Sequence, residues 1–213
     1  MYGQTVQIQG KYQETKIVVF DLDGTLYNKR GMVRRMMCGA LLDWRMMLIE
    51  RRTRTQLMGT WTGDKESFYN LFFQTMANGH RFSASYARWW YSTRYMPLMV
   101  KIIKKHYQLV PWVMPFIQQC KKLGVRLVVL SDYGHTTEKL QALGLEQSLF
   151  DWVVSAPELG GLKPAPQLMA RVAEQMGVQP NQCLVIGDRE DTDGALARSV
   201  GATYWRCNNE DPK

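Results

Sequence analysis

The apolar run from Ile17 to Phe20 stops abruptly at two carboxylates, Asp21 and Asp23. A strand with one face in water would alternate apolar and polar residues, so this continuous run predicts a strand that is covered on both faces. Parallel sheets between helices provide such cover, and their ligands bind beyond the carboxyl ends of the strands. Residues two apart in an extended segment point to the same side, so Asp21 and Asp23 can face one site.

The second half of the chain repeats this combination of apolar runs and helical spacing. The apolar runs lie at 125–131, 151–156, 183–188 and 202–205. Helical spacing lies near 115–122, 136–143, 166–176 and 192–199. Strands that alternate with helices are typical of a parallel α/β sheet. We therefore predict a Rossmann-like parallel sheet covered by helices on both faces.

Residues 29–111 differ in composition from the rest of the chain. They contain 15 Lys and Arg against 4 Asp and Glu, whereas the remainder contains 12 against 15, so the net charge of +8 comes from this segment. Helical spacing covers 31–52, 64–77 and 83–106, with no convincing strand between them. Two structural units are therefore predicted, and the methionines and tryptophans of this basic segment are interpreted as helical core.

Length and composition narrow the class of protein. With 213 residues, 46% hydrophobic and 22% charged, the chain is typical of a globular protein with a real core. Residues 1–15 form a polar N-terminal extension without the apolar centre of a signal peptide, and no apolar stretch approaches the roughly 18 residues of a membrane helix. The four cysteines lack metal or redox spacing, and Cys120 and Cys183 lie in apolar runs. We expect a soluble cytoplasmic protein without a membrane partner.

Two further apolar runs end in polar residues, at Ser131 and at Asp188. The second continues as GDREDTD, which adds further acids. Acids gathered at one edge of a sheet repel one another unless a hard divalent cation such as Mg²⁺ lies among them. Alternatively, these acids cap helices and turns. That explanation can hold for any one of them, but it explains poorly why three separate strands end in this way. Glu190 and Asp191 are interpreted as solvent-facing or helix-start acids.

Four motifs in this order resemble those of the haloacid dehalogenase superfamily, in its phosphatase branch. They are DLDGT at 21–25, Ser131 at the end of an apolar strand, Lys163 in GGLKPAP, and GDREDTD at 187–193. The resemblance covers about 14–28 and 112–213, and it implies an α/β core domain of residues 16–28 and 112–213. Residues 29–111 match the family only by their position, directly after the first motif, and this position implies that they are an inserted all-α cap domain.

The resemblance implies a Mg²⁺-dependent phosphatase that hydrolyses a small phosphorylated metabolite through an aspartyl-phosphate intermediate. Asp21 would be the nucleophile and a metal ligand. Asp23 would be the general acid and then the base, with its main-chain carbonyl on the metal. Dehalogenases of the superfamily lack a carboxylate at the second position because halide leaves without a proton, so Asp23 favours phosphate ester cleavage or phosphoryl transfer.

The other motif residues receive roles from the same resemblance. Ser131 and Lys163 would bind the phosphoryl group, and the lysine would offset repulsion between the nucleophile and an anionic phosphate. Asp188 would bind the metal, with Asp193 supporting it. Asp132 stands where relatives often carry a neutral residue, and its orientation decides whether it weakens anion binding. His135 is interpreted as a helix-start or surface residue.

The basic segment, as a cap, would close over substrate and read the leaving group. Its arginines suit an anionic substrate as a group, namely those at 30, 34, 35, 45, 51, 52, 54, 81, 88 and 94. The alternative is a solvated helix face, on which Glu50 and Arg54 have the spacing of a surface ion pair.

Two other functions remain open at this point. The first is a phosphomutase of the β-phosphoglucomutase type, which sugar-bisphosphate activation would reveal. The second is a binder of nucleic acid or another anionic partner, which would use the basic segment and the tryptophans at 44, 61, 89 and 90. Because the catalytic set is complete, nucleic acid is the less expected partner. The oligomeric state is not predicted.

Overall fold

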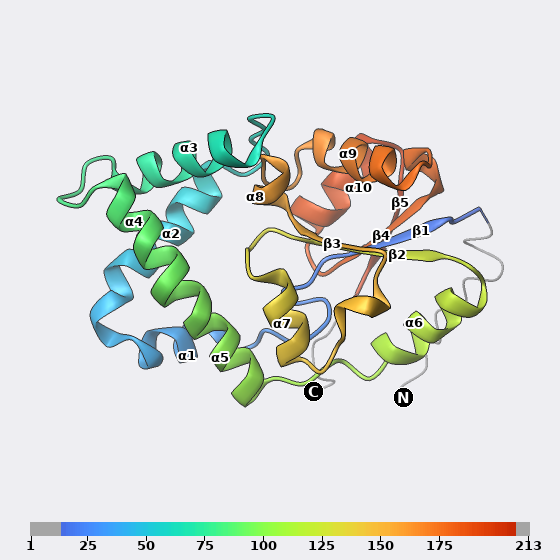
Figure 1. Cartoon of the computed structure of the whole chain (residues 1–213), viewed down its shortest axis with the longest axis horizontal. Coiled ribbons are helices and arrows are strands. Elements are labelled where there is room, and N and C mark those ends of the chain that lie inside the picture. The colour runs from blue at the N-terminus through green and yellow to red at the C-terminus, as the bar shows by residue number, and fades with distance from the viewer. Residues whose placement is uncertain (1–13, 208–213) are drawn as a thin grey trace.

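A computed structural model describes residues 14–207, so residues 1–13 of the expected N-terminal extension lie outside the described part of the chain. Five parallel strands form one sheet in the order β3-β2-β1-β4-β5 (Figure 1). They are β1 (Ile17–Phe20), β2 (Arg126–Ser131), β3 (Trp152–Ser155), β4 (Cys183–Gly187) and β5 (Thr203–Arg206). The predicted α/β sheet is confirmed, with β1 at its centre.

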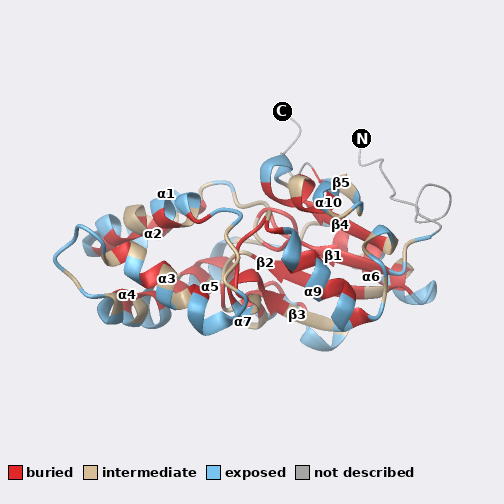
Figure 2. Cartoon of the chain, turned by 90° about the horizontal axis from the view of Figure 1, so that it is seen from above, coloured by how far each residue is buried: buried red, intermediate tan, exposed pale blue. Residues whose placement is uncertain are grey.

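Helices cover both faces of this sheet (Figure 1). On one face, α6 (Val113–Lys122) and α7 (Thr136–Ala142) pack against Val18 and Phe20. On the other face, α9 (Pro166–Met176) and α10 (Ala195–Ser199) pack against Ile17 and Val19. Figure 2 shows the central strands buried, as the continuous apolar runs predict. Cys120 and Cys183 are buried thiols, as expected.

The segment between β1 and β2 is a set of helices, here called the helical insertion. It contains α1 (Met32–Gly39), α2 (Trp44–Gln56), α3 (Lys65–Ala77), α4 (Ala84–Trp90) and α5 (Met96–His106). A π-helical turn, Tyr91–Tyr95, joins the last two. Its interior is rich in aromatic and methionine side chains, including Phe68, Trp90 and Met96. The division into a core domain and a cap domain with boundaries at 29 and 111 stays a prediction.

The prediction of one helix over 31–52 is wrong, because the chain turns between α1 and α2. A 3-10 turn, Leu41–Asp43, separates the two helices, and Leu41 and Leu42 are 71% and 94% exposed. Glycine is a poor helix former, and a Cβ at Gly39 would lie 3.0 Å from the Leu98 side chain of α5. A larger residue at this point would therefore require the Leu98 side chain to shift.

The helical insertion is hydrogen-bonded to two loops that follow core strands. Gly59 N donates to the Lys163 carbonyl (3.2 Å), and Leu162 N donates to the Thr60 carbonyl (3.0 Å). Arg54 Nη1 donates to the Asp132 carbonyl (2.5 Å), so α2 also contacts the loop after β2. These contacts place the insertion across the carboxyl ends of the strands. Among the described residues, no helix combines the length and apolar character that crossing a membrane requires.

Candidate active site

A cavity of about 580 Å³ lies between the carboxyl ends of the strands and the helical insertion. Its core side is lined by Asp21, Asp23, Lys163, Asp188 and Asp193. Five of the six predicted site residues therefore meet in one place, although they come from the ends of two strands, β1 and β4, from the turn after β4 and from a loop. A larger groove of about 800 Å³, elsewhere between the insertion and the core, contains none of them.

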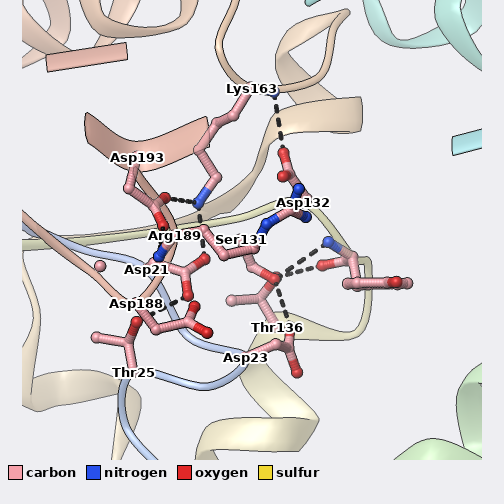
Figure 3. Close-up of polar contacts among 12 residues, drawn as sticks. Asp21, Asp23, Thr25, Ser131, Asp132, Thr136, Lys163, Asp188, Arg189 and Asp193 are labelled. Atoms are coloured by element: carbon pink, nitrogen blue, oxygen red, sulfur yellow. Dashed lines mark hydrogen bonds and ion pairs between the residues drawn. The ribbon is translucent and has the colours of Figure 1, made fainter. Parts of the chain in front are cut away.

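Lys163 lies between two of these acids (Figure 3). Its Nζ is 2.6 Å from Asp21 Oδ1 and 2.6 Å from Asp193 Oδ1. Burial alone would lower the pKa of Lys163, but the negative charges of Asp193 and Asp21 outweigh it and hold that pKa well above its usual range. The lysine therefore stays protonated at the floor of the cavity.

Two glycines allow the carboxylates to approach the strand ends so closely. A Cβ at Gly187, the last residue of β4, would lie 2.3 Å from the Asp193 carboxyl group. Gly24 has a positive φ of 108°, and a Cβ there would lie 2.6 Å from Asp188 Oδ2. Crowding as well as the positive φ therefore favours glycine at position 24 of the first motif.

The residues present suit a hard divalent cation. Carboxylate oxygens of Asp21, Asp188 and Asp193 lie within 4.8 Å of one another. Burial raises the pKa of Asp193 to about 7, with Asp21 adding to the shift and Lys163 opposing it. Burial and Asp21 likewise raise the pKa of Asp188. These carboxylates are crowded enough to disfavour their ionisation, and all the donor atoms are oxygens. Such a set suits Mg²⁺ better than it suits a metal that prefers thiol or imidazole ligands.

Lys29 contacts two of the predicted metal ligands. Its Nζ is 2.6 Å from Asp188 Oδ2, and it donates a hydrogen bond to the Asp23 carbonyl at 3.0 Å. Sequence reasoning did not single out this lysine. Its ammonium group provides positive charge at the position where a cation would lie.

Asp23 is held by three side chains. Tyr27 donates to its Oδ1 (2.7 Å), Ser131 donates to its Oδ2 (3.0 Å), and Lys139 forms an ion pair with the same oxygen. Burial would raise the pKa of Asp23, but the charge of Lys139 and these hydrogen bonds outweigh it, so that pKa lies below its usual value. Ser131 is fully buried beside Asp23 and Lys139, and it does not line the cavity.

Lys139 is a site residue that sequence reasoning missed. It is fully buried on α7, 116 residues from its partner Asp23 in the chain. The sequence did carry a signal, because helical spacing places Lys139 on the same face as the buried Leu140 and Leu143. A lysine in the apolar stripe of a helix requires a buried anion as its partner.

The structure settles the orientation of Asp132, which lines the cavity. Its Oδ1 accepts a hydrogen bond from the Lys163 backbone N–H (3.0 Å), so the acid lies beside the phosphate-binding residue that was predicted. Burial raises the pKa of Asp132, and Lys163 opposes that shift. His135 is half-buried at the start of α7, as interpreted. Glu190 and Asp191 are exposed, also as interpreted.

The interpretation of Glu50 and Arg54 as a surface ion pair is wrong. Their 2.6 Å salt bridge is buried, with side chains 0% and 12% exposed, because Tyr95 donates to Glu50 and Arg54 stacks over the Tyr133 ring. Of the ten candidate arginines, Arg51 and Arg54 line the cavity. Trp90 is fully buried, which removes one of the four rings proposed for base stacking.

Comparisons with known proteins agree with this geometry. A model of the haloacid dehalogenase-like hydrolase family matches residues 15–201. The chain belongs to this family. A solved haloacid dehalogenase-like structure, a predicted phosphoglycolate phosphatase from Haemophilus somnus, superimposes with a TM-score of 0.59 at 18% identity, covering 90% of this chain and 84% of that one. At that identity the likeness shows the fold alone.

Curated relatives of this hydrolase include phosphatases. The N-acylneuraminate-9-phosphatase of Rattus norvegicus is 38% identical over 85 residues, covering 38% of this chain. The chain spans only 34% of that relative's length. The glyceraldehyde 3-phosphate phosphatase of Methanocaldococcus jannaschii is 27% identical over 200 residues, covering 87% of this chain and 82% of the relative.

Proposed function

We propose that this haloacid dehalogenase-like hydrolase is a Mg²⁺-dependent phosphatase that cleaves a phosphate monoester through a phosphorylated Asp21. The observation that carries the proposal is the placement of the Asp21 carboxylate at the cavity, with the Lys163 ammonium group 2.6 Å away and Asp23 lining the same space. The phosphatases among its relatives support the same reaction class.

In the first step, a carboxylate oxygen of Asp21 forms a bond to phosphorus while the bond from phosphorus to the ester oxygen breaks. Asp23 in its protonated form donates its proton to that leaving oxygen; because its pKa lies below the usual value, only a small fraction of Asp23 has this form at neutral pH. In the second step, ionised Asp23 accepts a proton from water as the water oxygen attacks phosphorus, and the bond to Asp21 breaks. Inorganic phosphate leaves, and both carboxyl groups return to their starting states.

Positive charge must offset the approach of a carboxylate to an anionic phosphate. Lys163 provides it from within the chain, and its raised pKa keeps it charged. Mg²⁺ would be held by Asp21, Asp188, Asp193 and the Asp23 carbonyl, and when bound it supplies further neutralisation of phosphoryl oxygens. Ser131 stays a prediction as a phosphate ligand, since its hydroxyl donates to Asp23 in this structure.

The helical insertion acts in this proposal as the cap that excludes water from the cavity. Its hydrogen bonds to the Lys163 loop and to Asp132 support that role, because they join the insertion to both sides of the site.

Replacing Lys29 with Met is expected to tighten Mg²⁺ binding. The Lys29 ammonium contacts Asp188 and the Asp23 carbonyl, so it competes with a cation for both. A partly exposed ion pair contributes little free energy, so the competition is weak. We expect the dissociation constant for Mg²⁺ to decrease by up to about fivefold. Isothermal titration calorimetry with MgCl₂ measures it, with Lys122→Met as the control. Weaker Mg²⁺ binding in the variant would show that Lys29 supports the cation site instead.

Replacing Lys139 with Met is expected to move the acidic limb of the kcat–pH profile to higher pH. Without this partner, only the hydrogen bonds from Tyr27 and Ser131 oppose the effect of burial on Asp23, so its pKa rises. Asp23 must be ionised to accept the proton of water, so activity is lost over that higher pH range. If the acidic limb of the profile is unchanged in a folded variant, Lys139 does not influence the acid–base step.

Phosphate release from a broad panel of phosphate monoesters tests the proposed function. We expect turnover with MgCl₂, its loss with EDTA, and its return when excess Mg²⁺ is added. Absence of turnover on every ester, in folded protein that binds Mg²⁺, would contradict hydrolysis. A phosphomutase would instead transfer phosphate between sugar phosphates and respond to a sugar bisphosphate.

A further inference from the structure

The cavity has two chemically different sides. The core side carries the acids and Lys163, whereas the helical insertion contributes six methionines that we call the methionine wall: Met32, Met36, Met37, Met47, Met58 and Met99. They come from α1, α2, α5 and the loop after α2. Residues far apart in the insertion therefore converge on one apolar surface, opposite the charged residues.

The polar side chains beside the methionine wall are largely engaged with one another. Glu50 accepts hydrogen bonds from Arg54 Nε (2.9 Å) and Tyr95 OH (3.3 Å). Arg54 also donates to the Asp132 carbonyl, and Thr55 donates to the Arg51 carbonyl (3.0 Å). Apart from the exposed Arg51 side chain, the polar groups on this side are thus already partnered within the protein. A ligand with many hydroxyl groups would bury several of them against methyl and thioether groups, which is unfavourable.

We propose that the methionine wall binds an apolar leaving group, so that the substrates are phosphate monoesters of hydrophobic alcohols, not of polyols. This inference rests on the proposed function. Methionine side chains are flexible and polarisable, and they adapt to alkyl chains and rings of irregular shape. The phosphate binds beside Lys163, and the apolar part of the ester lies against the insertion.

A series of n-alkyl phosphates from methyl to hexyl phosphate tests the inference. We expect kcat/KM to rise by about fourfold per methylene until the wall is covered, the factor for burying one CH₂ group. Hexyl phosphate should exceed sorbitol 6-phosphate, which has the same number of carbons but carries hydroxyl groups. Flat chain-length dependence, or a preference for the polyol ester, would overturn the inference while leaving the phosphatase proposal intact.

Variants of the wall give a second measure. Met37 is half-buried and Met58 is 42% exposed, so Met37→Gln and Met58→Gln change polarity at nearly constant length with little demand on folding. We expect losses in kcat/KM that grow with chain length. Met114→Gln, a half-buried methionine of α6 that does not line the cavity, should leave the chain-length dependence unchanged. Equal losses for methyl and hexyl phosphate would contradict the assignment.

Binding of non-hydrolysable n-alkylphosphonates, measured by calorimetry, separates the two proposals. No turnover on any ester together with an affinity that rises with chain length would contradict the phosphatase and retain the methionine wall as an apolar binding surface. Absence of both would overturn the phosphatase and the wall together.

Discussion

Asparagine in place of Asp21 is expected to abolish phosphate release, with kcat falling by roughly 10⁴-fold or more, as for other removals of a catalytic nucleophile. The amide has nearly the same shape as the carboxylate, but it is a far weaker nucleophile and carries no charge. Phosphate release under saturating Mg²⁺ measures the effect.

The control is an exposed carboxylate away from the cavity. Glu174→Gln on α9 makes the same chemical change at the surface and should leave kcat unchanged. Circular dichroism and thermal unfolding confirm that both variants fold. Asp21→Asn activity within tenfold of the parent would remove Asp21 from the role of nucleophile.

Lys163→Met is expected to lose both activity and stability. The lysine is buried between Asp21 and Asp193, 2.6 Å from each, so its removal leaves two buried carboxylates without their cation. Breaking a buried pair in this way costs about 3–5 kcal/mol of unfolding free energy at neutral pH. Loss of charge stabilisation at the phosphate should lower kcat/KM by about 10²–10³-fold.

The stability loss should depend on pH. Lys163 opposes the effect of burial on Asp193, so without it the folded-state pKa of Asp193 rises further above that of the unfolded chain. The pKa of Asp193 is about 7 even with Lys163 present, so parent and variant both hold this proton below that pH. Above it the folded variant binds more protons than the folded parent, so the stability of the variant relative to the parent should fall further as pH rises above about 7.

Urea unfolding in EDTA at several pH values checks this dependence. The double variant Lys163→Met/Asp193→Asn removes the charge of Asp193 and should recover part of the stability that the single variant loses above pH 7. A loss that is the same at every pH would mean that packing, not charge, accounts for the effect of Lys163.

The fold was predictable because its central strands, β1, β2 and β4, are short and covered on both faces. Each is nearly continuous in apolar residues, which distinguishes a buried parallel strand from a helix or an exposed strand. The ends of such strands meet at one edge, so the convergence of Asp21 and Asp188 follows from the pattern alone.

Contacts that depend on packing between distant segments were not predictable. The buried pair of Glu50 and Arg54 has the same spacing as a surface pair, and side chains from distant segments, including Tyr95 and Tyr133, cover it. The proximity of Gly39 to Leu98 of α5 is likewise a contact between distant segments. Local spacing describes one helix at a time and contains no information on what covers it.

The most direct test of the central claim is detection of the phosphate on Asp21 itself. The enzyme would be quenched in acid during turnover of an ester with Mg²⁺, reduced with borohydride, and digested for mass spectrometry. We predict that Asp21 is converted to homoserine, the product of reducing an acyl phosphate, and that Asp23 is not. Phosphate release without modification of Asp21, or trapping at another residue, would contradict the account.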